Sequence, residues 1–269
     1  MRAFSKGGFC MLRQERLDSM VALIRSKGFM TVPQMCETFG VSPATIRRDL
    51  QHLVQARLVL RNRNGAVPYQ EHHTEASVHF RAAVHAREKE RIAAVASRLI
   101  QSDSLIFIDS SSTALSLINF LEARSNLTIV TNSLLLLTLM RDSRHRLILT
   151  GGSYFAPSHA FYGPLAVRAL QAYNFDLAMI SSVAITPDGY AAETLEHSVA
   201  VRQAAMERSE ATVLLCDSSK IGLRRPFNIA PVSRMKWVVT DAPERLAGIC
   251  TNVLPLDTQE APNEQKRPL

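Results

Sequence analysis

The segment VSPATIRRDL, which begins at Val41, constrains the fold of this chain more than any other stretch. Ser42 is suited to cap a helix, because its hydroxyl can accept a hydrogen bond from an otherwise unpaired backbone N–H. Pro43 suits the first helical position, where its fixed φ helps and its missing N–H costs nothing. These residues predict that a helix begins here.

The rest of the segment indicates what this helix does. Ile46, Leu50 and Leu53 follow one another at i, i+4 and i+7, which is typical of a buried stripe. The remaining faces begin with small side chains and then present two arginines, a pattern that fits a DNA major groove. The DNA contacts predicted for this helix are Ser42, Pro43, Ala44, Thr45, Arg47 and Arg48.

The residues before it complete a helix-turn-helix. Apolar residues at helical spacing predict a helix over residues 13–27, which Gly28 ends. A second amphipathic stretch covers about residues 32–39, and Gly40 then allows a tight turn into the helix at Ser42. Two helices joined by a short glycine-containing turn form this DNA-binding unit.

A β-wing is predicted after the helix that begins at Ser42. Residues 58–60 and 66–67 are short apolar runs, and Asn64-Gly65 between them is a strong hairpin signal. Arg61 and Arg63 are therefore predicted to meet phosphates or the minor groove at the tip of the wing.

The net charge supports this interpretation once it is located along the chain. Residues 1–70 hold 11 Lys and Arg against 4 Asp and Glu, whereas residues 71–269 hold 20 of each. The whole excess of +7 therefore lies on the predicted DNA-binding part, where release of counterions from phosphates would use it. A basic tail that only aids solubility is the alternative.

Composition limits the class of protein. With 269 residues, 46% hydrophobic and 20% charged, the chain is expected to be soluble and to form two domains. The four cysteines show no paired spacing, which argues against zinc and disulfides and fits a reducing cytosol. No run reaches the ~18 apolar residues of a membrane span. We therefore expect a cytoplasmic protein with no cofactor, no metal and no membrane partner, and Met11 is an alternative start.

Apolar runs alternate with helical patterns in the rest of the chain. This alternation predicts an α/β domain, a mostly parallel sheet covered by helices on both faces. Strands are expected at 105–108, 127–130, 147–149, 177–180, 212–215 and 237–239, with helices at about 88–100, 113–123, 134–140, 166–172 and 195–208. The predicted organisation is a winged helix-turn-helix at 11–68, a linker at 69–87, an α/β effector-sensing domain at 88–257 and a C-terminal tail at 258–269.

Polar residues follow several of these strands, and in open parallel sheets ligands bind beyond the carboxyl ends of the strands. Hydroxyls and free N–H groups that open a helix favour an anion such as phosphate, to which Lys220 could add a charge. Helix capping alone would explain any one of these loops. The predicted effector-binding residues are Asp109, Ser110, Ser111, Ser112, Thr113, Asn132, Gly151, Gly152 and Lys220.

Together these motifs resemble the DeoR family of bacterial transcriptional regulators, from about Met11 to Ala242. The quoted helix segment is the most specific match; further matches are residues 80–81, 88–89, 92–93, 131–133, 151–152, 163 and 217–220. The resemblance implies a winged helix-turn-helix followed by a sensor domain similar to sugar-phosphate isomerases. It also implies a phosphorylated sugar as effector, oligomerisation and repression of a metabolic operon.

Two positions depart from the family pattern. In the phosphate loop, usually D-S-G-T-T, Ser111 stands at the glycine, so the backbone is expected to approach an anion less closely. In the wing, the usual H-G-G-A reads R-N-G-A from Arg63, which adds positive charge.

The first functional hypothesis is thus a regulator of a carbohydrate-metabolism operon that binds double-stranded operator DNA and a small phosphorylated sugar. A homo-oligomer, dimer or tetramer, is expected because one helix-turn-helix rarely supplies enough contacts. The alternative is a sugar-phosphate isomerase with a DNA-binding appendage, for which Asp188 and Glu193 are the candidate bases. A DNA-architectural protein without a ligand is a third, weaker hypothesis.

Overall fold

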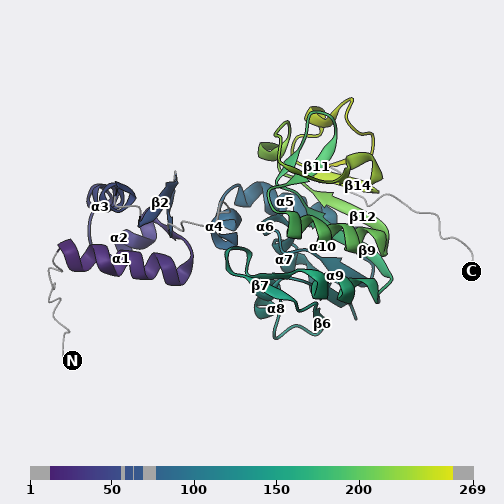
Figure 1. The fold of residues 1–269 in the computed structure, drawn as a ribbon, viewed down its shortest axis with the longest axis horizontal. Coiled ribbons are helices and arrows are strands. Elements are labelled where there is room, and N and C mark those ends of the chain that lie inside the picture. Colours follow the sequence, from purple (N-terminus) through teal and green to yellow (C-terminus); the bar gives the residue numbers. More distant parts are fainter. Residues whose placement is uncertain (1–12, 56–57, 63, 69–76, 257–269) are drawn as a thin grey trace, which may run out of the picture. The chain divides into compact units, whose positions relative to one another are not determined.

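The computed structural model describes residues 13–55, 58–62, 64–68 and 77–256, which form two compact units, residues 1–80 and 81–269 (Figure 1). The alternative start at Met11, the predicted contact Arg63 and the predicted tail at 258–269 lie outside the described residues. Within the described part of the chain, no helix is both long and apolar enough to cross a membrane.

The first unit is a helix-turn-helix with a β-wing, as the sequence predicts (Figure 1). Its three strands form one antiparallel sheet in the order β1-β3-β2. Ile46 and Leu50 are fully buried between the helices, and Leu53 is 2% exposed, which confirms the predicted stripe. The elements are α1 (Arg13–Lys27), β1 (Met30–Thr31), α2 (Val32–Phe39), α3 (Pro43–Gln55), β2 (Val59–Asn62) and β3 (Gly65–Pro68).

The wing turns one residue earlier than predicted. Asn62 pairs with Gly65, so Gly65 is the first residue of β3 and does not belong to the turn. Its Cα faces the backbone of β1, and a Cβ built on it would lie 2.1 Å from the carbonyl oxygen of Met30. The glycine therefore serves the close approach of β1, the third strand, which the local sequence does not reveal.

The second unit has a parallel seven-stranded sheet in the order β15-β14-β12-β9-β4-β5-β6. This confirms the predicted α/β fold class. The sheet strands are β4 (Leu105–Ile108), β5 (Thr128–Thr131), β6 (Arg146–Leu149), β9 (Phe175–Ser181), β12 (Ser209–Leu215), β14 (Trp237–Thr240) and β15 (Val253–Pro255). The helices are α4 (Val78–Ala83), which begins just before this unit, α5 (Ala86–Ser97), α6 (Ser112–Leu115), α7 (Ile118–Leu121), α8 (Leu134–Leu139), α9 (Pro164–Gln171) and α10 (Glu196–Glu207).

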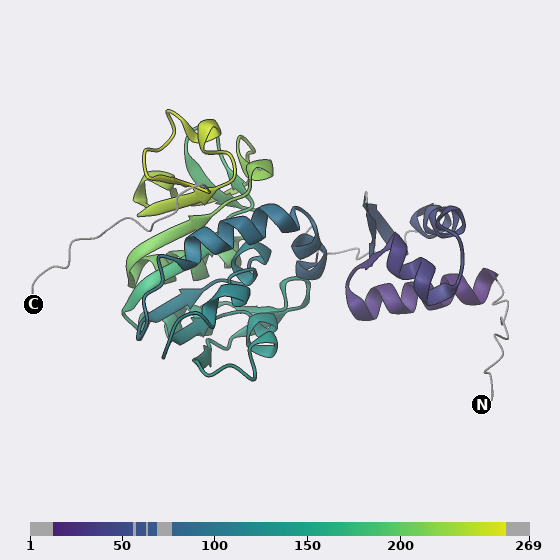
Figure 2. The same ribbon diagram turned by 180° about the vertical axis from the view of Figure 1, so that it is seen from behind.

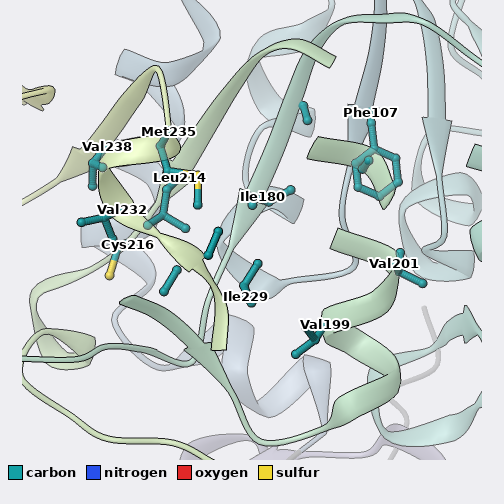
Figure 3. Close-up of a cluster of buried hydrophobic side chains, with 14 of the residues drawn as sticks. Phe107, Ile180, Val199, Val201, Leu214, Cys216, Ile229, Val232, Met235 and Val238 are labelled. Carbon is teal, nitrogen blue, oxygen red and sulfur yellow. The ribbon is translucent and has the colours of Figure 1, made fainter. Parts of the chain in front are cut away.

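Both faces of the sheet are covered. Phe107 lies in one buried cluster with side chains of α9 and α10, whereas its neighbours Ile106 and Ile108 lie in another with side chains of α5 to α8. Figure 1 shows α9 and α10 in front of the sheet. Figure 2, the view from behind, shows α5 in front of the opposite face. Figure 3 shows the first cluster, from Phe107 to Val238. Because successive strand residues point to opposite faces, one strand supplies both cores.

The strand order changes direction within the sheet. After β4 the chain builds β5 and β6 on one side, and it then returns to build β9, β12, β14 and β15 on the other. The order therefore reverses between β4 and β9, and parallel sheets bind ligands outside the carboxyl ends of the strands at such a point. The loops after Ile108 and Ser181 flank it.

The sequence prediction did not include β15, the seventh parallel strand, and three further segments differ from it. The helix expected over 113–123 is two short helices, because the N–H groups of Ser116 and Leu117 bond to carbonyls three residues back and tighten the turn. Part of the predicted linker at 69–87 is helical, in α4 and the start of α5, while residues 69–76 lie outside the described residues.

The third difference is a set of short antiparallel strands that the sequence prediction lacks. One hairpin joins β7 (Ser153–Phe155) to β8 (Ala160–Tyr162), with the 3-10 turn η1 (Ala156–Ser158) between them. A small sheet joins β10 (Ala184–Ile185), β11 (Tyr190–Glu193) and β13 (Phe227–Pro231). Most of these strands have two to four residues, too few for a clear alternating pattern. The remaining 3-10 turns are η2 (Ser218–Lys220), η3 (Val232–Arg234) and η4 (Pro243–Leu246).

Candidate functional site

The start of α3 has the predicted capped geometry. The backbone N–H of Thr45 donates to Ser42 Oγ at 3.2 Å, and the N–H of Ile46 donates to the Ser42 carbonyl oxygen at 3.1 Å. Pro43 is the first helical residue, and Ser42, Pro43 and Ala44 are all exposed. This end of the helix is therefore rigid and accessible to a partner.

Two arginines on α3 are exposed, and the acid that follows them is buried. Within the described residues, Arg47 and Arg48 form no ion pair. Asp49, only 2% exposed, accepts from Arg16 Nε at 2.8 Å and Arg13 Nε at 3.5 Å, both on α1. Asp49 thus fixes the orientation of α3, while the charge of Arg47 and Arg48 faces solvent.

The sequence prediction did not assign Asp49, although its spacing carries a signal. It follows Ile46 at i+3 and so lies on the buried face of α3. A carboxylate on such a face requires a cation, which α1 supplies.

A groove of about 660 Å³ lies between α2, α3 and the wing. Arg47 and Arg61 both line it, together with Cys36 and the N-terminal turn of α2. The structure therefore brings together one predicted contact from α3 and one from the wing. Two guanidiniums on the walls of one groove fit the phosphate backbone of a nucleic acid.

In the second unit, Lys220 joins the segment that follows β4 to the end of β9. Its ammonium donates to Thr113 Oγ1 at 3.1 Å and to Ser181 Oγ at 3.0 Å. It also lies 3.4 Å from a carboxylate oxygen of Asp217. Burial opposes ionisation of Asp217, yet the Lys220 ammonium holds its pKa below the ordinary value. The Lys220 side chain is 17% exposed.

Asp109 organises this loop from within. One of its carboxylate oxygens accepts from the N–H of Ser111 at 2.9 Å, and the other accepts from the N–H of Ser181 at 3.0 Å and from Arg202 Nε at 2.7 Å. The residue is 2% exposed. Asp109 therefore shapes the loop, and its two oxygens have protein partners.

Arg202, which the sequence prediction did not assign, is the centre of a buried ion-pair cluster. Besides Asp109, it contacts Glu193 Oε1 at 3.2 Å through Nη1 and also bonds to Ser198. Burial disfavours the charged guanidinium, but Glu193 and Asp109 raise its pKa above the ordinary value. The available signal was an arginine on a helix face that otherwise carries small and apolar residues.

Ser111 causes no strain at the position where the family pattern has glycine. Its φ is −74° and its ψ 150°, an extended conformation open to any residue. Its hydroxyl accepts from the N–H of Ala114 at 3.1 Å and so caps α6. The next two residues, Ser112 and Thr113, are also buried.

A hydroxyl network extends from this loop to the β7–β8 hairpin. Ser110 Oγ lies 3.0 Å from Tyr162 Oη and receives a bond from Asn132 Nδ2 at 3.3 Å. Tyr162 Oη in turn donates to Ser158 Oγ. The predicted residues Ser110 and Asn132 are thus in contact, and Tyr162 is a further residue of the site.

Gly152 sets the position of this hairpin. Its φ is +115°, and a Cβ on it would lie 2.5 Å from the carbonyl oxygen of Tyr162. Gly152 therefore acts on the site through Tyr162, whereas a Cβ on Gly151, whose φ is +68°, would meet no atom within 4 Å.

Lys89 is a buried cation near the same loops. It is 4% exposed and donates to the carbonyl oxygens of Arg81 and, at 2.7 Å, of Val84. Burial and the charge of Lys220 lower its pKa to about 8. The signal for Lys89 was a lysine on the apolar side of the predicted helix at 88–100.

The lowered pKa of Lys89 predicts a pH dependence of stability. Between pH 8 and about 10.5 the folded chain has lost the Lys89 proton and the unfolded chain keeps it, so the free energy of unfolding should rise with pH by about 1 kcal/mol per unit. Lys89→Met should lack this rise. Urea unfolding followed by fluorescence of Trp237, the single tryptophan, measures the difference. Parallel pH curves for the two proteins would contradict it.

In the described part of the chain, no group of three or more His, Cys, Asp and Glu side chains is arranged to hold a metal ion. The candidate site instead offers the ammonium of Lys220, several hydroxyls, the amide of Asn132 and, beside Tyr162, the imidazole of His197. Such groups bind anions and hydroxyls by hydrogen bonds and charge.

Both units match known protein families. Residues 16–71 match the DeoR-like helix-turn-helix domain, and residues 84–242 match the DeoR C terminal sensor domain. The second match alone covers more than half of the chain.

The full chain is similar to curated regulators. It is 33% identical over 235 residues to the glycerol-3-phosphate regulon repressor of Escherichia coli, which covers 87% of this chain and 92% of that protein. It is 30% identical to the L-fucose operon activator of Haemophilus influenzae, over 87% of this chain and 95% of that protein. A solved ribose 5-phosphate isomerase from Methanocaldococcus jannaschii is 16% identical with a TM-score of 0.37, over 49% of this chain and 53% of that chain.

Proposed function

The chain belongs to the DeoR family of transcriptional regulators, and we propose that it represses a carbohydrate-metabolism operon under the control of a small phosphorylated sugar or polyol. The observation that carries this proposal concerns Arg47 and Arg48. Both are exposed on the side of α3 away from its buried stripe, and neither forms an ion pair within the described residues. In this proposal α3 lies in the major groove of the operator.

Several features support the DNA-binding part. Ser42, Pro43, Ala44, Thr45, Arg47 and Arg48 share the N-terminal half of α3, and Arg61 shares the groove with Arg47. Asp49 holds α3 against α1 through Arg16 and Arg13. We propose that two copies bind a two-fold operator, because a single recognition helix buries little DNA surface.

The effector part rests on Lys220. Its ammonium bonds two hydroxyls, at Thr113 and Ser181, and lies 3.4 Å from a carboxylate oxygen of Asp217, so in this proposal a phosphate oxygen replaces one of these three partners. One relative is named for the glycerol-3-phosphate regulon, which favours a small phosphorylated polyol. We take repression from the same relative, although the similar L-fucose protein is an activator.

Catalysis is the less supported alternative. Isomerisation requires a carboxylate free to take a proton from the substrate. Glu193 is 4% exposed and paired with Arg202, and Asp188 is half exposed and lies 3.6 Å from Arg224. Neither carboxylate has the position of a general base. We therefore propose that the chain binds its effector without converting it.

Operator selection and ligand screening test the proposal together. Duplexes selected from a random pool by the full chain should share a two-fold motif, and a phosphorylated sugar or polyol that raises the melting temperature should change the affinity for this motif. Selection of no common motif would contradict the DNA-binding part. Turnover of the same phosphates, measured in parallel, would support the enzyme instead.

Lys220→Met is expected to weaken binding of glycerol 3-phosphate by about 10-fold to 100-fold, because one charged hydrogen bond to the phosphate is worth about 1.5–3 kcal/mol. Isothermal titration calorimetry measures the change. Since the variant leaves Asp217 without its cation, Lys220→Met/Asp217→Asn should restore stability without restoring affinity. Lys236→Met, at the exposed residue that precedes β14, is the charge-matched control. Unchanged affinity in both Lys220 variants would contradict the phosphate contact.

A further inference from the structure

Four buried polar atoms of the candidate effector site and its surroundings lack a hydrogen-bond partner among the described residues. They are Asn132 Oδ1, Ser182 Oγ, His197 Nε2 and Asp217 Oδ2, and the last lies 3.4 Å from the ammonium of Lys220. Asn132 is 1% exposed and Ser182 is 3% exposed. Buried polar atoms in proteins almost always have partners, so a group of such atoms indicates a missing polar ligand.

The orientation of the Asn132 amide determines which atom is left for a ligand. Its Nδ2 donates to the carbonyl oxygen of Phe161 at 3.1 Å and to Ser110 Oγ at 3.3 Å. A carbonyl oxygen can only accept, so the NH₂ group must face Phe161. Asn132 Oδ1 is then an acceptor, and its partner has to be a donor such as a hydroxyl.

His197 lies near the same end of the site. Its ring centroid is 4.6 Å from that of Tyr162 and 5.1 Å from that of Phe155. Tyr162 connects it to Ser110, and Ser110 connects it to Asn132. Lys220, in contrast, contacts Thr113, at the other end of the 109–113 loop. The site therefore has two chemically different ends.

The His197 end suits hydroxyls and not an anion. Burial lowers the pKa of His197, so the imidazole is neutral at pH 7 and offers one donor and one acceptor nitrogen. The charges nearest to it belong to Glu193 and Arg202, which are paired with each other. Phe155 and Tyr162 add apolar ring surface, which suits the C–H groups of a carbon chain.

We propose that His197 Nε2 and Asn132 Oδ1 bind hydroxyl groups of the effector and determine its specificity, while Lys220 binds the phosphate of the same molecule. The effector class is then a phosphate monoester with a polyhydroxylated carbon chain. This inference rests on the proposed effector site and adds the residues that distinguish a polyol phosphate from any other phosphate.

Pairs of phosphates with and without hydroxyl groups test the two ends of the site separately. Each polyol phosphate is compared with the alkyl phosphate of the same chain length: glycerol 3-phosphate with propyl phosphate, ribitol 5-phosphate with pentyl phosphate, and mannitol 1-phosphate with hexyl phosphate. Calorimetry on the full chain gives the ratio of affinities within each pair. We expect the parent to prefer at least one polyol phosphate by about 10-fold or more, because hydroxyls fill the unpartnered atoms.

His197→Phe keeps an aromatic ring beside Phe155 and Tyr162, slightly larger than the imidazole, and removes both nitrogens. It should lower the affinity for the preferred polyol phosphate by about 10-fold and leave the alkyl phosphate unchanged, so that the ratio falls towards one. His197→Gln returns a polar atom and should restore part of the ratio. Lys220→Met should instead weaken both members of a pair equally. His159→Phe, which changes a histidine of the hairpin that bonds to Tyr154, is the matched control.

The outcomes distinguish this inference from the proposed function. If the parent prefers a polyol phosphate and His197→Phe keeps the full ratio, the role of His197 is wrong and the proposed function stands. If the parent binds alkyl and polyol phosphates equally, hydroxyl recognition is wrong although the phosphate contact stands. If no phosphate of either kind binds while the operator does, the effector class and this inference both fail.

Discussion

Replacing both Arg47 and Arg48 by alanine is expected to reduce operator affinity by roughly 100-fold or more, since each arginine contact to DNA is worth about 1–3 kcal/mol. The logarithm of the binding constant should also depend less steeply on the logarithm of salt concentration, by about 0.9 for each phosphate that an arginine had neutralised. Both side chains are exposed, so the fold of the first unit should be unaffected. Anisotropy of a labelled, selected operator at several salt concentrations measures both quantities.

Matched variants make this result specific. Arg168→Ala/Arg234→Ala removes the same charge from exposed positions of the second unit and should change affinity by less than about 2-fold. Arg47→Lys/Arg48→Lys keeps the charge, so the salt slope should remain, whereas a lysine cannot replace any bidentate bond to a base. An affinity of the double alanine variant equal to that of the parent would remove α3 from the interface.

Arg202→Met is expected to lower the free energy of unfolding of the second unit by about 3–5 kcal/mol. The methionine fills similar space but leaves two buried carboxylates, Asp109 and Glu193, without their shared cation. Because Asp109 also holds the N–H groups of Ser111 and Ser181, the effector loop should loosen as well. Urea unfolding monitored by Trp237 reports this unit, and the melting temperature should fall by about 10 °C.

Neutralising the carboxylates tests the cause of this destabilisation. In Arg202→Met/Asp109→Asn/Glu193→Gln no uncompensated charge is buried, so a large part of the stability should return. Arg168→Met, on the exposed face of α9, is the control and should change stability by less than about 0.5 kcal/mol. If Arg202→Met lowers the free energy of unfolding by less than about 1 kcal/mol, then solvent, and not Arg202, compensates the charges of Asp109 and Glu193.

The helix-turn-helix could be predicted because its signals are local. Ser42 caps α3, Pro43 begins it, and Gly40 ends α2, so each boundary follows from one or two residues. The buried stripe of Ile46, Leu50 and Leu53 adds the periodicity. The turn of the wing was predicted one residue too late, because Gly65 is required by β1, which lies more than thirty residues earlier in the chain.

In the second unit, six of the seven parallel strands were predicted from their apolar runs, but β15 and the short antiparallel strands were not. The β7–β8 hairpin supplies Tyr162 and Ser158, and no periodic pattern marks it. The single helix expected at 113–123 was also wrong, because three-residue hydrogen bonds divide it into α6 and α7.

The amino-acid sequence by itself determined the DNA-binding motif, the excess charge on it, the parallel sheet and the polar strand-end loops. Caps, turns and periodicity act between residues a few positions apart, so they can be read along the chain. The tertiary structure alone decided that β4 and β9 are neighbours, and hence that Asp109 meets Arg202 and Lys220 meets Thr113. Those contacts join residues about a hundred positions apart, and they form because burying both faces of one sheet fixes the order of its strands.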